Sequence, residues 1–157
     1  MSTGTWESYH AITTLMFRYT ECIDAADFAG IGELFAHGEI TNRGVDGAIV
    51  GAEAVQQLYS RTNRVHPNGT TMTRHLCTNV IVDAAESAGV ARARSPFLVL
   101  RASPALSLQP SVAGRYFDTF ARAHGAWRFA QREMVVEQVG DVREHLSIDL
   151  SRFVDGA

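Results

Sequence analysis

Polar residues alternate with apolar ones over residues 72–80, which read Met-Thr-Arg-His-Leu-Cys-Thr-Asn-Val. His75, Cys77 and Asn79 share one parity, and period-two alternation places such residues on one face of a β-strand. An imidazole, a thiol and an amide on one face are typical of a strand that turns this face toward a pocket. A solvated face with ordinary polar residues would show the same pattern, and both interpretations stay open for the strand alone.

A carboxylate, Asp24, lies where the sequence predicts the end of a long N-terminal helix. Apolar side chains recur at helical spacing through this segment, at Ile12, Leu15, Met16, Tyr19, Cys22 and Ile23. A carboxylate in the last turn of a helix opposes the helix macrodipole, so Asp24 occupies an electrostatically poor position. This position invites a functional explanation, but on this point alone a solvated aspartate at a frayed helix end is the favoured interpretation.

Asp24 and His75 can meet if the N-terminal helix packs over the sheet face that carries His75. An aspartate that accepts from one ring nitrogen fixes the tautomer and raises the basicity of the other nitrogen. His75 could then remove a proton from a substrate C–H or O–H bond and return it later. Tyr19 is either a donor to the oxygen of an enolate-like state or a core tyrosine. This chemistry needs no metal and no organic cofactor.

Four further residues are candidates for contacts with a substrate: Cys77, Asn79, Asp118 and Arg122. Cys77 and Asn79 share the predicted face of His75. Asp118 and Arg122 share a parity on the predicted strand 108–123, which places them in or beside the pocket or makes them a structural ion pair. A nucleophilic pair of Cys77 and His75 is disfavoured, because neighbours at i and i+2 on one strand point in parallel.

The elements that must position these residues are helices first and long strands afterwards. Helices are predicted over residues 6–25, 28–35 and 51–61, with Asp27 as N-cap of the second. Strands are predicted over 37–41, 48–50, 71–84, 89–102, 108–123 and 126–138, and Pro96 argues for an edge position or a bulge. A short helix over 142–146 is the one element expected in the tail. This order predicts an α+β fold, with the helices packed on one face of a mainly antiparallel sheet that curls into a cone around a pocket.

Length and composition are those of one soluble globular domain over residues 1–157, with 46% apolar and 20% charged residues. The net charge of -3 gives no reason to expect a nucleic acid or an anionic membrane as partner. The two cysteines match no metal-ligand spacing and favour a cytoplasmic setting. The N-terminus does not read as a signal peptide, and no apolar run is long enough to cross a membrane.

Several short motifs resemble those of SnoaL-like proteins of the nuclear transport factor two-like superfamily, in order and spacing, from about residue 8 to about residue 135. They include Arg-Tyr-Thr at 18–20 with Ile-Asp at 23–24, Thr-Arg-His at 73–75, and Gly-Arg-Tyr at 114–116 with Gly-Ala-Trp at 125–127. The resemblance implies an α+β cone with a deep pocket. The superfamily includes scytalone dehydratase, bile-acid 7α-dehydratase, hexachlorocyclohexane dehydrochlorinase, ketosteroid isomerase, polyketide cyclases and the small subunits of Rieske dioxygenases.

By this resemblance, Asp24 and His75 stand where the dehydratase and dehydrochlorinase branch carries a His–Asp dyad. Tyr19 matches a tyrosine that the bile-acid dehydratases place before the aspartate, and Arg122 lies near an arginine that the dehydrochlorinase uses. The chain departs from scytalone dehydratase in two respects. Ile23 precedes Asp24, where that enzyme has a Tyr-Asp pair, and no residue of this chain clearly matches the second catalytic histidine of that enzyme.

We therefore expect a cofactor-independent dehydratase (lyase), or an isomerase or cyclase, that acts on a small hydrophobic, cyclic, oxygenated substrate such as a polyketide or steroid. We also expect a homodimer or homotrimer. The alternative is a noncatalytic ligand-binding or assembly module. Candidates for an interface on the outer sheet face are Phe117, Ala121, Phe129 and Val135.

Overall fold

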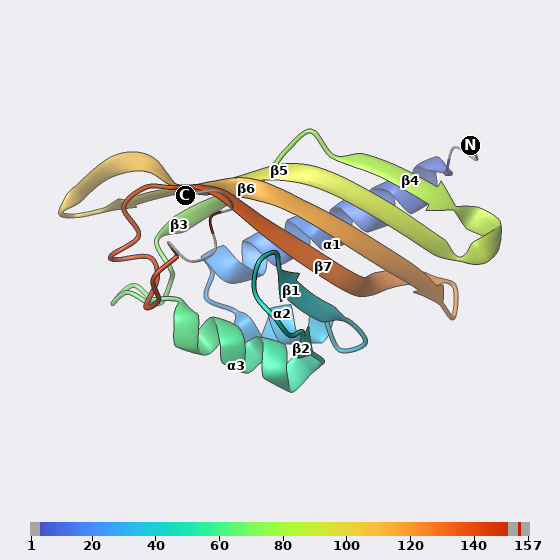
Figure 1. Ribbon diagram of the computed structural model, residues 1–157, viewed down its shortest axis with the longest axis horizontal. Coiled ribbons are helices and arrows are strands. Elements are labelled where there is room, and N and C mark those ends of the chain that lie inside the picture. Colours follow the sequence, from blue (N-terminus) through green and yellow to red (C-terminus); the bar gives the residue numbers. More distant parts are fainter. Residues whose placement is uncertain (1–3, 151–153, 155–157) are drawn as a thin grey trace.

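The computed structural model describes residues 4–150 and residue 154, and its elements follow the predicted order (Figure 1). The helices are α1 (Trp6–Asp24), α2 (Phe28–Leu34) and α3 (Ala52–Thr62). The strands are β1 (Glu39–Asn42), β2 (Ile49–Val50), β3 (Thr73–Cys77), β4 (Ile81–Ala85), β5 (Val90–Ser103), β6 (Leu106–Ala123) and β7 (Ala126–Val139), with a 3₁₀ turn, η1 (Glu86–Ala88), before β5.

The strands form one curved sheet in the order β2-β1-β7-β6-β5-β3, and β4 pairs with β5 alongside β3. Neighbours in the described sheet are antiparallel except β1 and β7, which run parallel. Helix α1 lies across one face of the long strands, and α2 and α3 lie beside β1 and β2 (Figure 1). The predicted α+β fold with a mainly antiparallel, curved sheet is confirmed. No helix among the described residues is long and apolar enough to cross a membrane.

Local sequence explains where α1 ends. Asp27 caps α2, as predicted, because its side chain accepts a hydrogen bond from the backbone N–H of Gly30 at 2.9 Å. Ala26, between the two helices, has a φ of 57°, in the left-handed region, and this reverses the direction of the chain. Asp24 is therefore the last residue of α1 and lies beside β3.

The predicted strand 71–84 is in fact two strands, β3 and β4, separated by a turn over residues 78–80. Asn79 in this turn has a φ of 50°, a conformation that asparagine adopts more readily than most residues. Pro96 on β5 lies opposite the interruption, since β3 pairs with β5 on one side of it and β4 on the other. A proline has no N–H to donate, so a gap in the neighbouring strand suits it. At Pro96 the predicted departure from regular pairing is therefore a break in the neighbouring strand, at residues 78–80 between β3 and β4.

A β-bulge in β7 changes which of its side chains face the core. The pairing of β6 with β7 skips Ala130, which has no directly opposed residue. One extra residue in a strand reverses the alternation of its side chains. Phe129 is therefore completely buried, and its proposed place on an outer-face interface is wrong.

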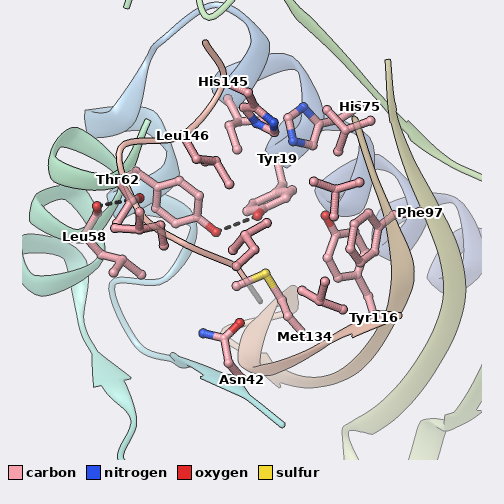
Figure 2. Close-up of a pocket in the computed structure, with 17 residues that line it drawn as sticks. Tyr19, Asn42, Leu58, Thr62, His75, Phe97, Tyr116, Met134, His145 and Leu146 are labelled. Carbon is pink, nitrogen blue, oxygen red and sulfur yellow. Dashed lines mark hydrogen bonds between the residues drawn. The ribbon is translucent and has the colours of Figure 1, made fainter. Parts of the chain in front are cut away.

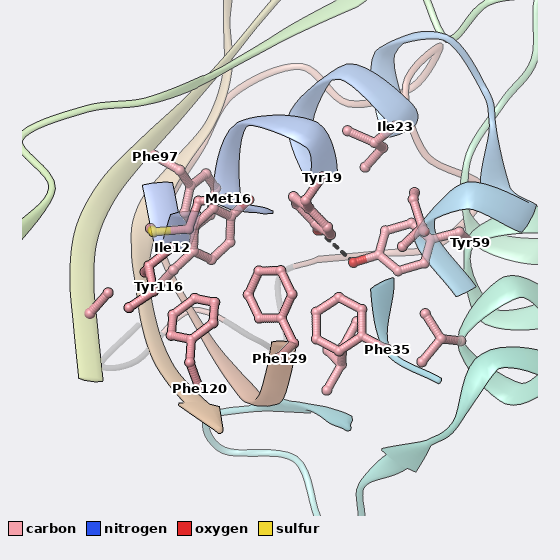
Figure 3. Packing of buried hydrophobic residues seen from close by; sticks show 14 of the residues in the cluster. Ile12, Met16, Tyr19, Ile23, Phe35, Tyr59, Phe97, Tyr116, Phe120 and Phe129 are labelled. Atoms are coloured by element: carbon pink, nitrogen blue, oxygen red, sulfur yellow. Dashed lines mark hydrogen bonds between the residues drawn. The ribbon is translucent and has the colours of Figure 1, made fainter. Parts of the chain in front are cut away.

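The core fills the space between the helices and the inner face of β5, β6 and β7. Aromatic rings dominate it, and Figure 3 shows Phe35, Phe129 and Phe120 in a row next to Tyr19. The Phe129 ring stacks on Phe35 and lies tilted against Phe120, with 4.6 Å between ring centroids in each pair. Such rings bury a large apolar area in a fixed geometry, so they hold α1 and α2 on the sheet.

An ion pair lies within this apolar core. Arg132 on β7 donates two hydrogen bonds to the carboxylate of Asp118 on β6, at 2.8 and 2.7 Å, and both side chains are completely buried. The guanidinium carbon also lies 3.9 Å from the ring centroid of Tyr116 and 4.2 Å from that of Tyr19. Burial by itself lowers the pKa of Arg132, but Asp118 and the two tyrosines raise it above its ordinary value. Arg132 is therefore charged inside the core, where it packs against both tyrosine rings.

Removing one partner of this pair will be costly. We expect Asp118→Asn to lower the free energy of unfolding by about 3–5 kcal/mol in urea titrations, because the guanidinium stays buried without its counter-charge. The control is Asp83→Asn, since Asp83 has a 70% exposed side chain and lies 3.5 Å from Arg94. Asp83→Asn should lower the free energy of unfolding by at most about 1 kcal/mol. Equal losses in the two variants would contradict a structural role for the buried pair.

Candidate active site

Asp24 and His75 are in direct contact. Oδ1 of Asp24 lies 2.6 Å from Nδ1 of His75, and the two side chains are 9% and 5% exposed. The backbone N–H of His75 donates to the same carboxylate, at 3.0 Å from Oδ2, and the Thr73 hydroxyl donates to Oδ1 at 2.8 Å. Two consecutive inward positions of β3 thus hold the end of α1.

The contact sets the charge of Asp24 and the tautomer of His75. Burial raises the pKa of Asp24, but the hydrogen bonds from His75 and Thr73, together with the attraction to His75 when its ring is protonated, outweigh burial, so the pKa of Asp24 lies below its usual value. An ionised carboxylate only accepts hydrogen bonds, so the Nδ1 proton of His75 points to Asp24. In the neutral form of the ring the lone pair then lies on Nε2 of His75, which has no hydrogen-bond partner in the described part of the chain.

His75 lines a cavity of about 150 Å³, shown in Figure 2. The walls are mostly apolar and come from the helices, the sheet and the segment after β7: Tyr19, Ile23, Asn42, Leu58, Tyr59, Thr62, His75, Phe97, Val99, Val112, Tyr116, Met134, Val136, His145, Leu146, Ile148 and Leu150. An engineered protein cavity of about 150 Å³ binds benzene. The volume therefore suits one ring with small substituents.

Three tyrosines meet in the cavity wall. The hydroxyls of Tyr19 and Tyr59 are 2.5 Å apart, and the Tyr116 ring lies edge-on to Tyr19 at 5.9 Å between centroids. Burial raises the pKa of both Tyr59 and Tyr116 well above 10, so they are protonated phenols near neutral pH. In the pair of Tyr19 and Tyr59 one hydroxyl donates to the other, and the accepting hydroxyl keeps a proton that it can offer to a ligand.

A second imidazole, His145, enters the cavity from the segment after β7. The helix predicted over 142–146 is absent from this segment, where the backbone N–H groups of His145 and Leu146 both donate to the carbonyl of Val142 at 2.9 Å, forming a turn. The His145 ring lies 5.9 Å from the His75 ring between centroids, at 75°. Figure 2 shows both rings at the same end of the cavity.

Comparison of the sequence with models of known protein families assigns the chain to a family. A SnoaL-like domain model matches residues 4–133, most of the chain. The chain belongs to the SnoaL-like family. No curated protein matches the sequence.

Solved structures share the fold of this SnoaL-like domain. A variant of Rv3472, a protein of unknown function from Mycobacterium tuberculosis, has a TM-score of 0.70 at 25% identity, over 86% of this chain and 79% of that one. A proposed scytalone dehydratase from Novosphingobium aromaticivorans has a TM-score of 0.67 at 23% identity, over 86% and 87%. ActVI-ORFA from Streptomyces coelicolor has a TM-score of 0.68 at 18% identity, over 85% and 99%. At these identities the last two show the fold alone.

The residues expected to bind substrate from β3 and its extension do not line the cavity of the SnoaL-like domain. Asn79 is exposed in the turn between β3 and β4, because the strand that was to carry it ends at Cys77. The Cys77 thiol lies 3.1 Å from the Ser95 hydroxyl, and burial raises the pKa of this thiol. A thiol with a raised pKa is a poor nucleophile.

Asp118 and Arg122 on β6 do not line the cavity either. Asp118 lies two residues beyond Tyr116 on β6. It pairs with Arg132, whose guanidinium packs against the Tyr116 ring. Arg122 lies six residues beyond Tyr116, or about 20 Å along the strand. It forms an ion pair with Glu86 and stacks on Trp127 at the far end of α1.

Sequence reasoning missed five polar residues of the cavity wall, namely Asn42, Tyr59, Thr62, Tyr116 and His145. Tyr59 and Tyr116 occupy inward positions of α3 and β6, where a tyrosine is indistinguishable from a core residue until the cavity is known. His145 lies beyond the segment matched by the family model, in a turn without hydrophobic periodicity. Its position depends on contacts distant in sequence, such as the bond from the Ser147 N–H to the Thr62 carbonyl at 2.8 Å.

His145 should make the stability of the protein depend on pH. Burial, followed by His75 and Arg101, lowers the pKa of His145 to about 3. The unfolded chain therefore binds a proton at this group when the pH falls below about 6.5, whereas the folded chain does not, so stability is lost as the pH falls. In urea titrations the wild type should lose about 2 kcal/mol more than His145→Gln between pH 7 and pH 5. Parallel pH dependences of the two proteins would contradict a buried, neutral His145.

Proposed function

We propose that this chain is a cofactor-independent acid–base enzyme, a dehydratase or an isomerase or cyclase, in which His75 moves a proton of a small cyclic ketone or related oxygenated compound. The observation that carries the proposal is the contact of 2.6 Å between Asp24 and His75 at the wall of an apolar cavity. Membership of the SnoaL-like family and the likeness to a proposed scytalone dehydratase support it.

The chemical step begins with Nε2 of His75, whose lone pair points away from Asp24. It removes a proton from the carbon next to a carbonyl group, and the C–H electron pair moves into the carbonyl to give an enolate. The resulting imidazolium is stabilised by the ionised carboxylate of Asp24, which keeps its own charge throughout. In a dehydration the proton then passes to the departing hydroxyl group, and water and a conjugated enone are formed. In an isomerisation it returns to another carbon.

Tyr19 is the proposed donor to the enolate oxygen, acting as one member of the phenol pair with Tyr59. Their hydroxyls are 2.5 Å apart, so whichever phenol accepts can direct its own proton into the cavity. The apolar walls strengthen such a hydrogen bond, because the effective dielectric constant inside a protein is lower than in water.

The size of the cavity narrows the class of substrate. A cavity of about 150 Å³ suits a compound with one ring, since a cavity of this volume binds benzene. A four-ring steroid needs a cavity several times larger. The proposal therefore favours the small end of the predicted range, such as a monocyclic intermediate of polyketide type. A noncatalytic module would not need its polar pair to reach a cavity, and here His75 lines one.

The test is proton abstraction itself, which dehydration, isomerisation and cyclisation share. We expect His75→Ala and Asp24→Asn each to slow the exchange of cyclohexanone α-hydrogens in D₂O, followed by NMR, and the dehydration of 3-hydroxycyclohexanone, followed by ultraviolet absorbance. The loss should be at least about 100-fold, the usual scale of acid–base catalysis.

Matched controls separate this effect from a change in folding. Asp27→Asn makes the same substitution three residues later and keeps the cap of α2, since asparagine caps a helix as well as aspartate does. His37→Ala removes an exposed imidazole that does not line the cavity. Both controls should keep wild-type rates. If His75→Ala and Asp24→Asn keep them too, the dyad proposal is wrong.

A further inference from the structure

We propose that Nε2 of His145 is a hydrogen-bond acceptor for a hydroxyl group of the substrate, so that the site selects a ring that keeps this hydroxyl through the reaction. The inference rests on the proposed function and narrows its class of substrate. His145 lies outside the segment matched by the family model, residues 4–133. Three features of the ring carry the inference: its anchoring, the position of its proton and the open side of Nε2.

Backbone contacts hold the His145 ring in the cavity wall. The carbonyl of His145 accepts from the backbone N–H of Arg64 at 2.9 Å, and Leu146 forms a β-bridge with Asn63, just after α3. His145 itself is buried, with 3% of its surface exposed. Because the backbone is tied at His145 and at the next residue, the ring is a fixed part of the site.

The contacts of Ser111 place the ring proton of His145 on Nδ1. The Ser111 hydroxyl lies 3.0 Å from Nδ1 of His145 and 3.4 Å from the backbone carbonyl of Asp141. A carbonyl only accepts, so the Ser111 hydroxyl donates to Asp141, and its oxygen accepts from the Nδ1–H group. Both contacts are satisfied only in this arrangement. In the neutral imidazole the lone pair then lies on Nε2.

The surroundings keep His145 neutral, so this lone pair is retained. Burial, followed by repulsion from His75 when its ring is protonated and from Arg101, lowers the pKa of His145 to about 3. Arg101 is a fixed charge, because its side chain is 1% exposed and pairs with Glu144 at 2.6 Å. A nitrogen that resists protonation in this way acts near neutral pH as a hydrogen-bond acceptor and not as a general base.

Nε2 of His145 is open to the cavity and has no hydrogen-bond partner among the described residues. Some polar side-chain atoms of these residues are fully buried without a partner, namely Asn63 Oδ1, Arg101 Nη1, Ser103 Oγ and Arg132 Nη1. Nε2 of His145 is not one of them, so it has accessible surface, and the cavity is what the ring borders. An acceptor in a mostly apolar wall is satisfied when a ligand brings a donor to it.

The two imidazoles therefore present lone pairs at one end of the cavity (Figure 2). His75 keeps its proton on Nδ1, toward Asp24, and the rings lie 5.9 Å apart between centroids, at 75°. A donor comes instead from the phenol pair of Tyr19 and Tyr59. A substrate thus binds with its hydrogens toward the imidazoles, the acidic C–H at His75 and a hydroxyl at His145, and with its carbonyl oxygen at the phenols.

The hydroxyl that binds to His145 is not the leaving group of a dehydration. Departure as water requires a proton delivered to the oxygen, and Nε2 of His145 has none to give. A hydrogen bond from the hydroxyl to Nε2 also polarises its oxygen toward negative charge, which disfavours cleavage of the C–O bond. The departing hydroxyl is the one that receives the proton from His75. The substrate therefore carries a second hydroxyl group, which the product retains.

Binding of resorcinol, a single ring with two hydroxyl groups, tests the acceptor. The matched ligand is 3-fluorophenol, in which a fluorine of similar size replaces one hydroxyl and cannot donate. In isothermal titration calorimetry at pH 8, we expect the wild type to bind resorcinol at least about tenfold more tightly than 3-fluorophenol, because the second hydroxyl reaches an otherwise unpaired acceptor.

Two substitutions separate the nitrogens of His145. Asparagine can keep an N–H beside Ser111, in the place of Nδ1, but has no atom in the place of Nε2. Glutamine can turn its amide oxygen to that place. We expect the preference for resorcinol to fall below about twofold in His145→Asn and to stay within about threefold of wild type in His145→Gln. His37→Asn, which replaces an exposed imidazole that does not line the cavity, should keep the full preference.

Several outcomes would overturn the proposal: no binding of resorcinol by wild type, no preference over 3-fluorophenol, a preference that survives in His145→Asn, or one that is lost equally in His145→Gln. Thermal unfolding at pH 8, where His145 is neutral in both states, shows whether each variant is folded. If His145→Asn does not fold, His145→Phe, which keeps a ring and has no acceptor, takes its place in the same comparison.

Failure of this inference differs from failure of the proposed function. If His75→Ala and Asp24→Asn lose α-hydrogen exchange while His145→Asn keeps the preference for resorcinol, the dyad stands and His145 selects no hydroxyl. If the preference is lost in His145→Asn while His75→Ala and Asp24→Asn keep wild-type exchange, the acceptor stands and the dyad proposal is wrong.

Discussion

The carboxylate of Asp24 joins the end of α1 to β3, and the arrangement of the site depends on this connection. A negative charge at a helix C-terminus costs roughly 0.3–1 kcal/mol against the macrodipole. Here the carboxylate accepts from the His75 ring, the His75 backbone and the Thr73 hydroxyl. Hydrogen bonds to a charged group contribute about 1.5–3 kcal/mol each, so the donors outweigh the dipole. The same contacts fix the direction of the His75 lone pair and the height of α1 above the sheet.

A second pair of charges, Arg132 and Asp118, lies against two tyrosines of the cavity wall. Arg132 and Asp118 pair in the core, and the guanidinium carbon lies 4.2 Å from the ring centroid of Tyr19 and 3.9 Å from that of Tyr116. A buried charge without a partner would attract water or a ligand ion to this place. Because the two charges are paired, the cavity keeps mostly apolar walls, and Tyr19 and Tyr116 are among its polar groups.

The parts of the site that were predictable are those governed by local periodicity. Helical spacing placed Tyr19 and Asp24 on α1, and strand parity placed His75 toward that helix. Parity fails wherever the backbone leaves the regular conformation. The left-handed Asn79 ends β3 and removes that residue from the predicted face, and the bulge at Ala130 reverses β7. Neither feature has a sequence signal as strong as the alternation that it interrupts.

His145 shows the other limit of sequence reasoning, because its position is set by tertiary contacts with residues 62–66 and 111. These contacts also mean that the segment after β7 completes the cavity, through His145, Leu146, Ile148 and Leu150. A ligand bound there would contact both this segment and the sheet. Whatever binds in the cavity must therefore stabilise the docked segment by the same free energy with which the docked segment stabilises the ligand. Ligand binding and docking of the segment are therefore coupled, and the site has its full set of polar groups only when the segment is in place.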